Sequence, residues 1–139
     1  MGTETSLKKV RYSTLNARQK ENFNFQKAAA ALADYGFNSI RVTDDWKGAD
    51  FIAAHKNGIT FLKIQLKGRL TFDRKYIGNK IYVCFPNGSD WFLCPHDALL
   101  RKLSKTMNFT RTRSWKEKGS YSFNNLSQET ERLMSKYKL

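Results

Sequence analysis

Residues 50–67 have the pattern of a β-hairpin, and this segment constrains the fold more than any other part of the chain. The dipeptide Asn57-Gly58 at its centre favours a two-residue type I′ turn, because both turn positions need positive φ. The register that follows from such a turn places Asp50 opposite Gln65, with Cβ atoms about 4.5–5.5 Å apart. Because side chains alternate between the faces of a strand, Gln65 and Lys67 share a face. We therefore expect one Asp, one Gln and one Lys on a single patch of sheet.

Each of these positions also has a purely structural interpretation. Asp50 can simply begin a strand after the turn residues that precede it. Gln65 and Lys67 can form the solvent face of an amphipathic strand. The other face of that strand is mostly aliphatic: Thr60, Leu62, Ile64 and Leu66. The combination of the three residue types with this register, together with a surplus of positive charge, favours a functional patch.

The chain is strongly basic, with 25 Lys and Arg against 12 Asp and Glu in 139 residues and a net charge of +13. The stretches 63–80 and 101–120 hold 11 of these 13 net charges. Aromatic residues lie among the basic ones: Phe72, Tyr76, Phe109 and Trp115. Such a surface favours a polyanion as partner, above all the phosphates of a nucleic acid. A solvated basic face without a specific partner is the alternative, and a membrane surface is a weaker one.

The composition indicates a single folded domain. Apolar residues make up 40% of the chain and aromatic residues 14%, and the length suits one core. We see no signal peptide and no transmembrane run, so we expect a soluble, cytoplasmic protein without membrane association. Cys84 and Cys94 lie in apolar runs and are expected to be buried free thiols in a reducing compartment. A zinc site at Cys94 and His96 would need two further ligands.

The sequence pattern predicts an α/β domain over residues 1–139, with a core of about 23–105 and a basic C-terminal extension of about 106–139. The expected elements, in chain order, are a loosely held arm (1–13), a helix (24–35, with a start as early as Thr14), a strand (39–42), a polar loop (43–48), the hairpin, a basic loop (68–79), two strands (81–85 and 91–93), a helix beginning at Pro95, an aperiodic stretch (106–125) and a last helix capped by Ser127.

Four segments of the chain resemble the catalytic core of the PD-(D/E)XK nuclease superfamily: 25–26, 31–37, 45–53 and 64–67. Within this superfamily, the likeness is greatest to the Mrr-type restriction endonucleases, whose third motif position is often Gln. The resemblance covers roughly residues 23–95. It implies a restriction endonuclease-like αβββαβ-type core, with a central mixed sheet flanked by helices.

The resemblance also implies an activity, which is the metal-dependent hydrolysis of phosphodiester bonds in DNA by an endonuclease of restriction, repair or homing type. Mg²⁺ would be the metal, with Mn²⁺ as a substitute, and its ligands would be Asp50, Gln65 and the backbone carbonyl of Leu66. Lys67 would be the signature lysine, which positions the attacking water or stabilises the transition state. Gln26 takes a helix position at which many relatives carry Glu. Because one site cuts one strand, cleavage of both strands implies a homodimer or a larger homo-oligomer.

We expect contacts with DNA from side chains around the patch and in the C-terminal segment: Lys63, Arg69, Arg74, Lys75, Arg111, Arg113, Trp115 and Lys116. Trp115 can stack on a base or sugar, or can pack as a lid on the core. Since Gln26 and Gln65 are amides, Asp50 is the one motif carboxylate, unless Asp44, Asp45 or Glu21 reaches the site. A non-catalytic nucleic-acid-binding protein on a degenerate nuclease fold is therefore the alternative function. A ribonucleoprotein or ribosome-associated factor is a weaker one.

Overall fold

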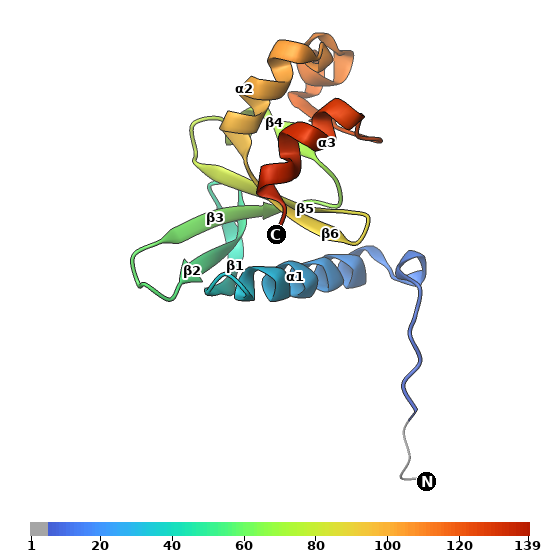
Figure 1. Ribbon diagram of the computed structural model, residues 1–139, viewed down its shortest axis with the longest axis vertical. Coiled ribbons are helices and arrows are strands. Elements are labelled where there is room, and N and C mark those ends of the chain that lie inside the picture. Colours follow the sequence, from blue (N-terminus) through green and yellow to red (C-terminus); the bar gives the residue numbers. More distant parts are fainter. Residues whose placement is uncertain (1–5) are drawn as a thin grey trace.

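The computed structural model describes residues 6–139, apart from the side chains of residues 45 and 46. A five-stranded mixed sheet lies in the middle, in the order β1-β2-β3-β5-β6, with helices on both of its faces (Figure 1). The elements are α1 (Ala17–Ala33), β1 (Phe37–Trp46), β2 (Ala49–His55), β3 (Phe61–Leu66), β4 (Thr71–Asp73), β5 (Ile81–Asn87), β6 (Asp90–Pro95), α2 (His96–Thr106), β7 (Ser120–Ser122) and α3 (Gln128–Met134). The predicted fold class, an α/β core with a central mixed sheet flanked by helices, is confirmed.

Helix α1 covers one face of the sheet. It begins at Ala17, closer to the early start at Thr14 than to residue 24, because Asn16 forms a capping box with Gln19. The Asn16 side chain accepts the Gln19 N–H at 2.8 Å, and the Gln19 side chain accepts the Asn16 N–H at 2.9 Å. The helix buries Ala28 and Leu32 against the sheet. Their partners there are Phe51, Ala53, Ile64 and Cys84.

The hairpin of β2 and β3 has the predicted register but not the predicted turn. Phe51 pairs with Ile64, so Asp50 lies opposite Gln65. Asn57 does not have the positive φ that a type I′ turn needs, so the predicted turn is wrong. The Asn57 side-chain oxygen instead accepts the N–H groups of Ile59 and Thr60, at 2.8 and 2.9 Å. These bonds stabilise a wider loop without changing the strand register.

Paired positive φ values occur instead in the turn between β1 and β2. Lys47 and Gly48 have φ of 54° and 89°, and the flanking residues Trp46 and Ala49 are paired. Both values are typical of a type I′ turn. The β1–β2 register shifts between Arg41 and Trp46, so that β1 carries extra residues opposite Asp50. The predicted polar loop 43–48 is therefore a bulged strand end followed by a tight turn.

The connection between the parallel strands β3 and β5 contains no helix. Strand β4 and a single 3₁₀ turn, Arg74–Tyr76, occupy it instead. Leu70, Phe72 and Tyr76 are buried, so the segment predicted as a basic loop is in large part folded. Strand β4 also pairs with β7, so the C-terminal segment helps to cover these apolar side chains.

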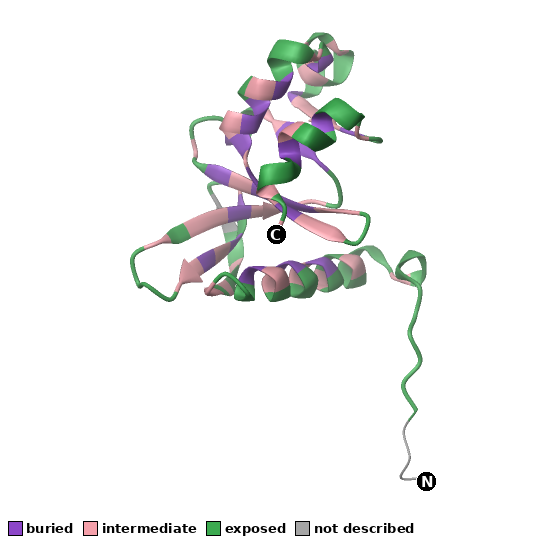
Figure 2. Ribbon diagram, viewed as in Figure 1, coloured by how far each residue is buried: buried purple, intermediate pink, exposed green. Residues whose placement is uncertain are grey.

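The C-terminal segment completes the core on the second face of the sheet. Two short helical turns, Phe109–Arg111 and Ser114–Lys118, lead to β7, and α3 follows. The Ser127 side chain accepts the Thr130 N–H at 3.1 Å, so the predicted cap of the last helix is confirmed. Phe109, Phe123 and Met134 are buried with residues of β5, β6 and α2. Figure 2 shows buried segments in these C-terminal elements as well as in the central sheet.

Two further sequence predictions concern the cysteines and the membrane. Cys84 and Cys94 are buried free thiols, as predicted, and burial raises the pKa of each to about 12. Among residues 6–139, no helix has the length and apolar character that crossing a bilayer requires.

Candidate active site

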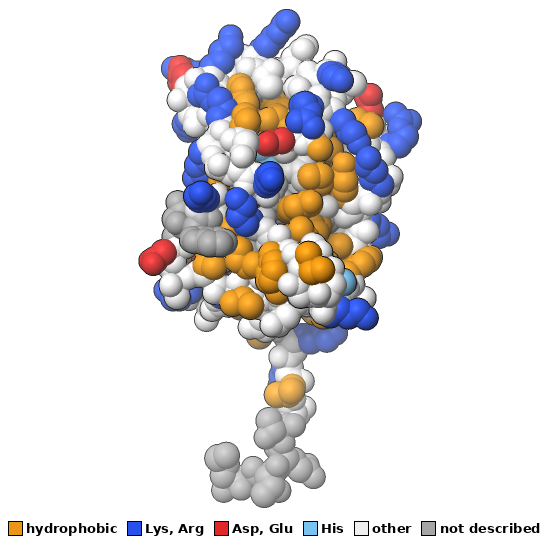
Figure 3. Space-filling model, turned by 90° about the vertical axis from the view of Figure 1, so that its left-hand side faces the viewer, with side chains coloured by type: hydrophobic (Ala, Val, Ile, Leu, Met, Phe, Trp, Pro, Cys, Tyr) orange, Lys and Arg blue, Asp and Glu red, His pale blue; other side chains and the backbone are white. Residues whose placement is uncertain are grey.

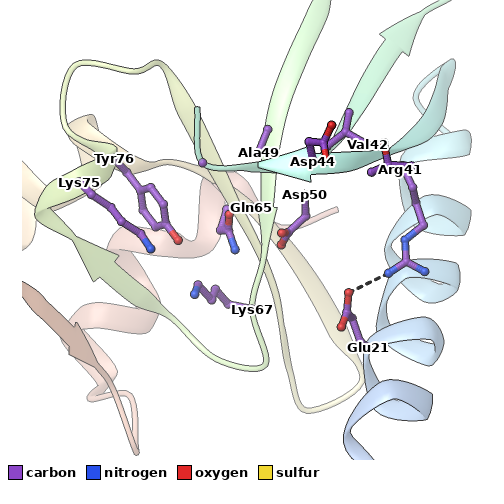
Figure 4. Close-up of a pocket in the computed structure, with 12 residues that line it drawn as sticks. Glu21, Arg41, Val42, Asp44, Ala49, Asp50, Gln65, Lys67, Lys75 and Tyr76 are labelled. Atoms are coloured by element: carbon purple, nitrogen blue, oxygen red, sulfur yellow. Dashed lines mark hydrogen bonds and ion pairs between the residues drawn. The ribbon is translucent and has the colours of Figure 1, made fainter. Parts of the chain in front are cut away.

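A hollow of about 410 Å³ lies where the ends of β1, β2 and β3 meet (Figure 4). Its lining is mostly polar, and it includes all three residues of the predicted patch. The lining residues are Glu21 from α1; Arg41, Val42, Thr43 and Asp44 from β1; Gly48 from the β1–β2 turn; Ala49 and Asp50 at the start of β2; Gln65 at the end of β3 and Lys67 directly after it; and Lys75 and Tyr76 from the 3₁₀ turn. Sequence positions that are 46 residues apart, Glu21 and Lys67, therefore contribute to one site.

The local backbone explains why the hollow forms here. The bulge at the end of β1 lies opposite Asp50, and bulges often re-aim side chains beside functional sites. Gly48 then allows the buried ring of Tyr76 to approach the turn. A Cβ atom at Gly48 would lie 2.9 Å from Cδ1 of Tyr76, closer than real Cβ contacts allow. The turn and the Tyr76 ring thus form one packed wall of the site.

The Asp50 carboxylate is held across the hairpin. Its Oδ2 accepts the N–H of Leu66 at 2.8 Å. Partial desolvation in the hollow raises the pKa of Asp50 above its ordinary value, and the negative charge of Glu21 adds to this effect. The Leu66 hydrogen bond and the positive charges of Lys67 and Arg41 lower the pKa in turn, so the net shift is upward. The side chain of Leu66 packs with the buried residues between α1 and the sheet, such as Leu32 and Ile64. The role of the Leu66 carbonyl as a metal ligand stays a prediction.

Gln65 and Lys67 lie beside Asp50 as the sequence predicted. Figure 4 shows the Gln65 side chain between Asp50 and Tyr76, with Lys67 below it. The Nζ atoms of Lys67 and Lys75 lie 5.9 and 5.3 Å from the centroid of the Tyr76 ring. Because an aromatic face attracts cations, this ring gathers two ammonium groups at the site.

Gln26 does not reach the site, and Glu21 takes the place that was predicted for it. Gln26 is exposed and does not line the hollow. Five residues along an α-helix correspond to about 500° of rotation, so Gln26 and Glu21 point roughly 140° apart. Glu21 is on the same side of α1 as Phe25, Ala28 and Leu32. An assignment of the helix phase from these apolar positions could have found Glu21 in the sequence.

Glu21 is paired with an arginine at the edge of the hollow. Its Oε1 accepts a hydrogen bond from Nη2 of Arg41 at 2.9 Å. Nη1 of Arg41 donates to the side chain of Asn22 at 2.7 Å, and the guanidinium lies 4.8 Å from the centroid of the Phe25 ring. Asp44 also lines the hollow, whereas the side chain of Asp45 lies outside the described part of the chain.

The basic residues that were predicted to contact nucleic acid fall into two groups. Lys75 lines the candidate site, and Lys63 lines a second hollow together with Lys80 and Arg101. Arg111 and Lys116 are exposed. These four side chains remain candidates for phosphate contacts. Figure 3 shows Lys and Arg side chains spread over the upper part of the molecule, where α2 and the C-terminal elements lie.

The remaining predicted contacts are used, at least in part, within the chain. Arg69 donates to the side chain of Asn124 at 2.6 Å, and Arg113 pairs with Glu117 at 3.0 Å. Arg74 donates to the carbonyl of Lys116 at 3.2 Å and lies 5.9 Å from the Trp115 ring. Trp115 is half-buried and meets Phe109 edge-on, with ring centroids 6.0 Å apart. Of the two roles proposed for Trp115, this contact supports the lid.

The zinc alternative finds no support in the structure. His96 is buried, and its Nε2 accepts the N–H of Asp73 at 3.1 Å. Its Nδ1 lies 2.8 Å from Oδ1 of Asp97, so this nitrogen carries the proton. Among residues 6–139, no group of three or more His, Cys, Asp or Glu side chains is arranged to bind a metal ion by itself.

Comparison with solved structures finds a similar protein, whereas comparison with protein families and curated sequences finds none. No protein family model matches the chain, and no curated protein matches its sequence. The solved structure is that of Hjc, a Holliday junction resolvase from the archaeal hyperthermophile Archaeoglobus fulgidus. The match has a TM-score of 0.44 and 20% sequence identity, and it covers 56% of this chain and 74% of that chain.

Proposed function

We propose that this protein is a metal-dependent endonuclease that hydrolyses phosphodiester bonds in DNA. The observation that carries the proposal is the meeting of Asp50, Gln65 and Lys67 in one polar hollow, with Glu21 at its edge. A net charge of +13 supports a polyanionic substrate for this site. Three predictions from the sequence remain: a restriction, repair or homing role, the Mrr-type likeness, and assembly as a homodimer or a larger homo-oligomer.

The donor atoms at the site fit Mg²⁺. Asp50 and Gln65 offer a carboxylate and an amide oxygen, and Mg²⁺ prefers oxygen ligands. Proteins often bind this ion through one or two carboxylates, while substrate phosphates and water complete its shell. Glu21 would become a second carboxylate ligand if its ion pair with Arg41 opened. When bound, Mg²⁺ supplies Lewis-acid stabilisation of charge on a phosphate, and Mn²⁺ is expected to substitute for it.

The chain's own residues would bind and orient the substrate. The Lys67 ammonium group can donate hydrogen bonds to an attacking water or to a phosphoryl oxygen, on which negative charge grows in the transition state. Lys75 adds a second cation on the same wall of the hollow. The hydrogen bond from the Leu66 N–H fixes the Asp50 carboxylate across the two strands, so that its position is set before substrate binds.

A specific observation favours a second function, that of a nucleic-acid-binding protein without catalysis. Glu21 is neutralised by Arg41, and Gln65 carries no charge, so Asp50 is the one motif carboxylate, with Asp44 as a further carboxylate in the lining. A site with so little negative charge holds a divalent ion weakly. In this alternative the basic surface binds nucleic acid, and the hollow is the remnant of a catalytic site.

The two functions are separated by a cleavage assay. The purified protein is incubated with supercoiled plasmid and with single-stranded and branched oligonucleotides, in Mg²⁺, Mn²⁺ or EDTA. We expect metal-dependent cleavage that falls by about 100-fold or more in Asp50→Ala and in Lys67→Ala. Gln26→Ala is the matched control on α1 and should cut like the wild type, whereas Glu21→Gln should need a higher metal concentration.

Three results would decide against parts of the proposal. Binding of the nucleic acids without cleavage in any metal would support the non-catalytic alternative. Undiminished cleavage by both Asp50→Ala and Lys67→Ala would place the active site elsewhere. A loss of activity in Gln26→Ala that equals the loss in Glu21→Gln would contradict the assignment of the α1 residue.

A further inference from the structure

Another hollow, of about 500 Å³, lies beside the N-terminal half of α1, apart from the candidate active site and from the hollow at Lys63. Three aromatic side chains, Tyr12, Phe23 and Trp91, contribute to its lining, which is mostly apolar. Gly68 and Gly88 contribute bare backbone, and a Cβ atom at either position would meet no other atom within 4 Å. The hollow is therefore open space flanked by flat rings. We name it the aromatic groove.

The rings of the aromatic groove are exposed and held in place. Tyr12 and Phe23 are 41% and 39% exposed, and their ring centroids lie 5.3 Å apart. The Tyr12 hydroxyl accepts a hydrogen bond from the side chain of Asn24 at 3.0 Å, and Asn24 is itself buried. A ring that is anchored in this way loses little conformational freedom when a ligand packs against it.

Two lysines accompany these rings. Nζ of Lys20 lies 5.4 Å from the centroid of Tyr12, and Nζ of Lys27 lies 5.4 Å from the centroid of Phe23. Each ammonium group lies over its ring, so a base that stacks on that face takes the place of the ammonium group. The displaced lysine can then meet the phosphate of the same nucleotide. An apolar peptide would make no use of the two charges.

The aromatic groove adjoins the candidate active site at the end of β3. Lys67 lines the active site, and the next residue, Gly68, lines the groove. A nucleic acid strand that passes the site can therefore continue into the groove.

We propose that the aromatic groove binds an unpaired nucleobase of the strand whose phosphate occupies the candidate active site. In a paired duplex the bases are stacked on one another and cannot stack on a protein side chain, so the groove selects nucleic acid with unpaired bases beside the scissile phosphate. The proposal rests on the proposed function, because it assumes that nucleic acid is the ligand, and it names the class of substrate.

The test compares two single strands that carry the same number of phosphates, namely oligothymidine and an abasic strand of equal length. Affinities are measured by fluorescence anisotropy in EDTA, so that no cleavage occurs. We expect the wild type to prefer oligothymidine by about 5- to 100-fold, which corresponds to the stacking of one base. Tyr12→Ala and Phe23→Ala should remove this preference and leave binding of the abasic strand unchanged.

Three further variants separate stacking from general damage. Tyr35→Ala removes a 51% exposed aromatic ring from another part of the surface and should keep the preference. Tyr12→Phe keeps the ring without its hydroxyl and should also keep the preference. Gly68→Leu fills the aromatic groove at a position with open space and no positive φ, and it should remove the preference with all rings intact.

Equal binding of both strands by the wild type would overturn the inference, and so would a loss of preference in Tyr35→Ala as large as in Phe23→Ala. The outcome is independent of the cleavage assay. If the protein never cuts but prefers oligothymidine, the proposal for the aromatic groove is supported and the nuclease function is contradicted. If it cuts in the presence of metal but shows no preference, the nuclease function is supported and the proposal for the groove is contradicted.

Discussion

Burial raises the pKa of Asp50 above its ordinary value of 3.8, and this shift links the site to the stability of the fold. The folded protein holds the Asp50 proton more tightly than the unfolded chain does, so protonation of Asp50 stabilises the fold. This stabilisation is complete below pH 3.8 and is lost as the pH rises through the raised pKa of the folded protein. The ionised Asp50 carboxylate, which the proposed metal site requires, thus lowers the free energy of unfolding at neutral pH.

The substitution Asp50→Asn should therefore increase the free energy of unfolding at neutral pH while it abolishes cleavage. The amide oxygen can still accept the Leu66 N–H, so the cross-strand hydrogen bond is retained. Urea unfolding of both proteins near pH 7 and near pH 3 measures the effect. The gain should shrink at the acidic pH, where the carboxyl group of the wild type is neutral as well. A variant that is less stable than the wild type near pH 7 would contradict this account.

Gly48 and Gly58 provide a second comparison between single residues. Both have positive φ, of 89° and 73°, but a Cβ atom meets the Tyr76 ring at Gly48 and open space at Gly58. We expect Gly58→Ala to lose about 1 kcal/mol of stability through backbone strain alone. Gly48→Ala should lose about 1–3 kcal/mol more, because the buried ring must move. Thermal unfolding gives both values. Equal losses would show that the contact with Tyr76 has no energetic consequence.

At the residue scale, the sequence predicts positions that depend on local geometry. Asp50, Gln65 and Lys67 follow from a hairpin register and a two-residue period, and both are properties of neighbouring residues. Gln26 lies outside the hollow because the face of α1 that meets the site depends on how the helix packs on the sheet. The same packing brings Glu21 to Arg41, a contact across 20 positions of sequence that no local pattern contains.

At the scale of elements, the hairpin register was correct although its turn was not. Phe51 and Ile64 both face α1, and a slip of one residue would turn such side chains towards the opposite face of the sheet. Burial of the strands therefore determines the register, and the loop at Asn57 adapts to it. Strands β4 and β7 could not be predicted, since each has three residues and their pairing joins distant segments, such as Phe72 and Tyr121.

The pairing of β4 with β7 leads to a prediction for the C-terminal segment. A chain that ends at Lys118 lacks β7 and α3, and with them the buried side chains of Phe123 and Met134. We expect it to lose cooperative unfolding, because the remaining core would expose Phe72 and Phe109. Near-ultraviolet circular dichroism and thermal scans measure this. The matched control is a chain that begins at Arg11. Residues 6–10, which it lacks, are exposed, so this chain should unfold like the full chain. Cooperative unfolding of the chain that ends at Lys118 would mean that the C-terminal segment is dispensable.

For the molecule as a whole, the net charge of +13 favours binding of a polyanion, but it does not identify the Lys and Arg side chains that contact the phosphates. The sequence could not separate Arg74 from its neighbour Lys75, because both lie in the same basic stretch. In the structure, the guanidinium of Arg74 contacts the carbonyl of Lys116 and the Trp115 ring, whereas Lys75 lines the candidate site. The first residue holds two segments of the chain together, and the second is available to a phosphate.

The substitution Lys75→Ala should therefore change DNA binding, whereas Arg74→Ala should change stability. For DNA binding measured over a range of salt concentrations, Lys75→Ala should reduce the slope of log K against log salt by about 1, because one fewer counterion is released. Its stability should stay close to that of the wild type. Arg74→Ala should keep the salt slope but lose about 1 kcal/mol of stability, since it gives up a hydrogen bond and a cation–π contact. Lys56→Ala, at the exposed hairpin loop, controls for a change of one charge. If all three variants reduced the slope equally, DNA would respond to net charge alone, and the assignment of phosphate contacts to the candidate site would fail.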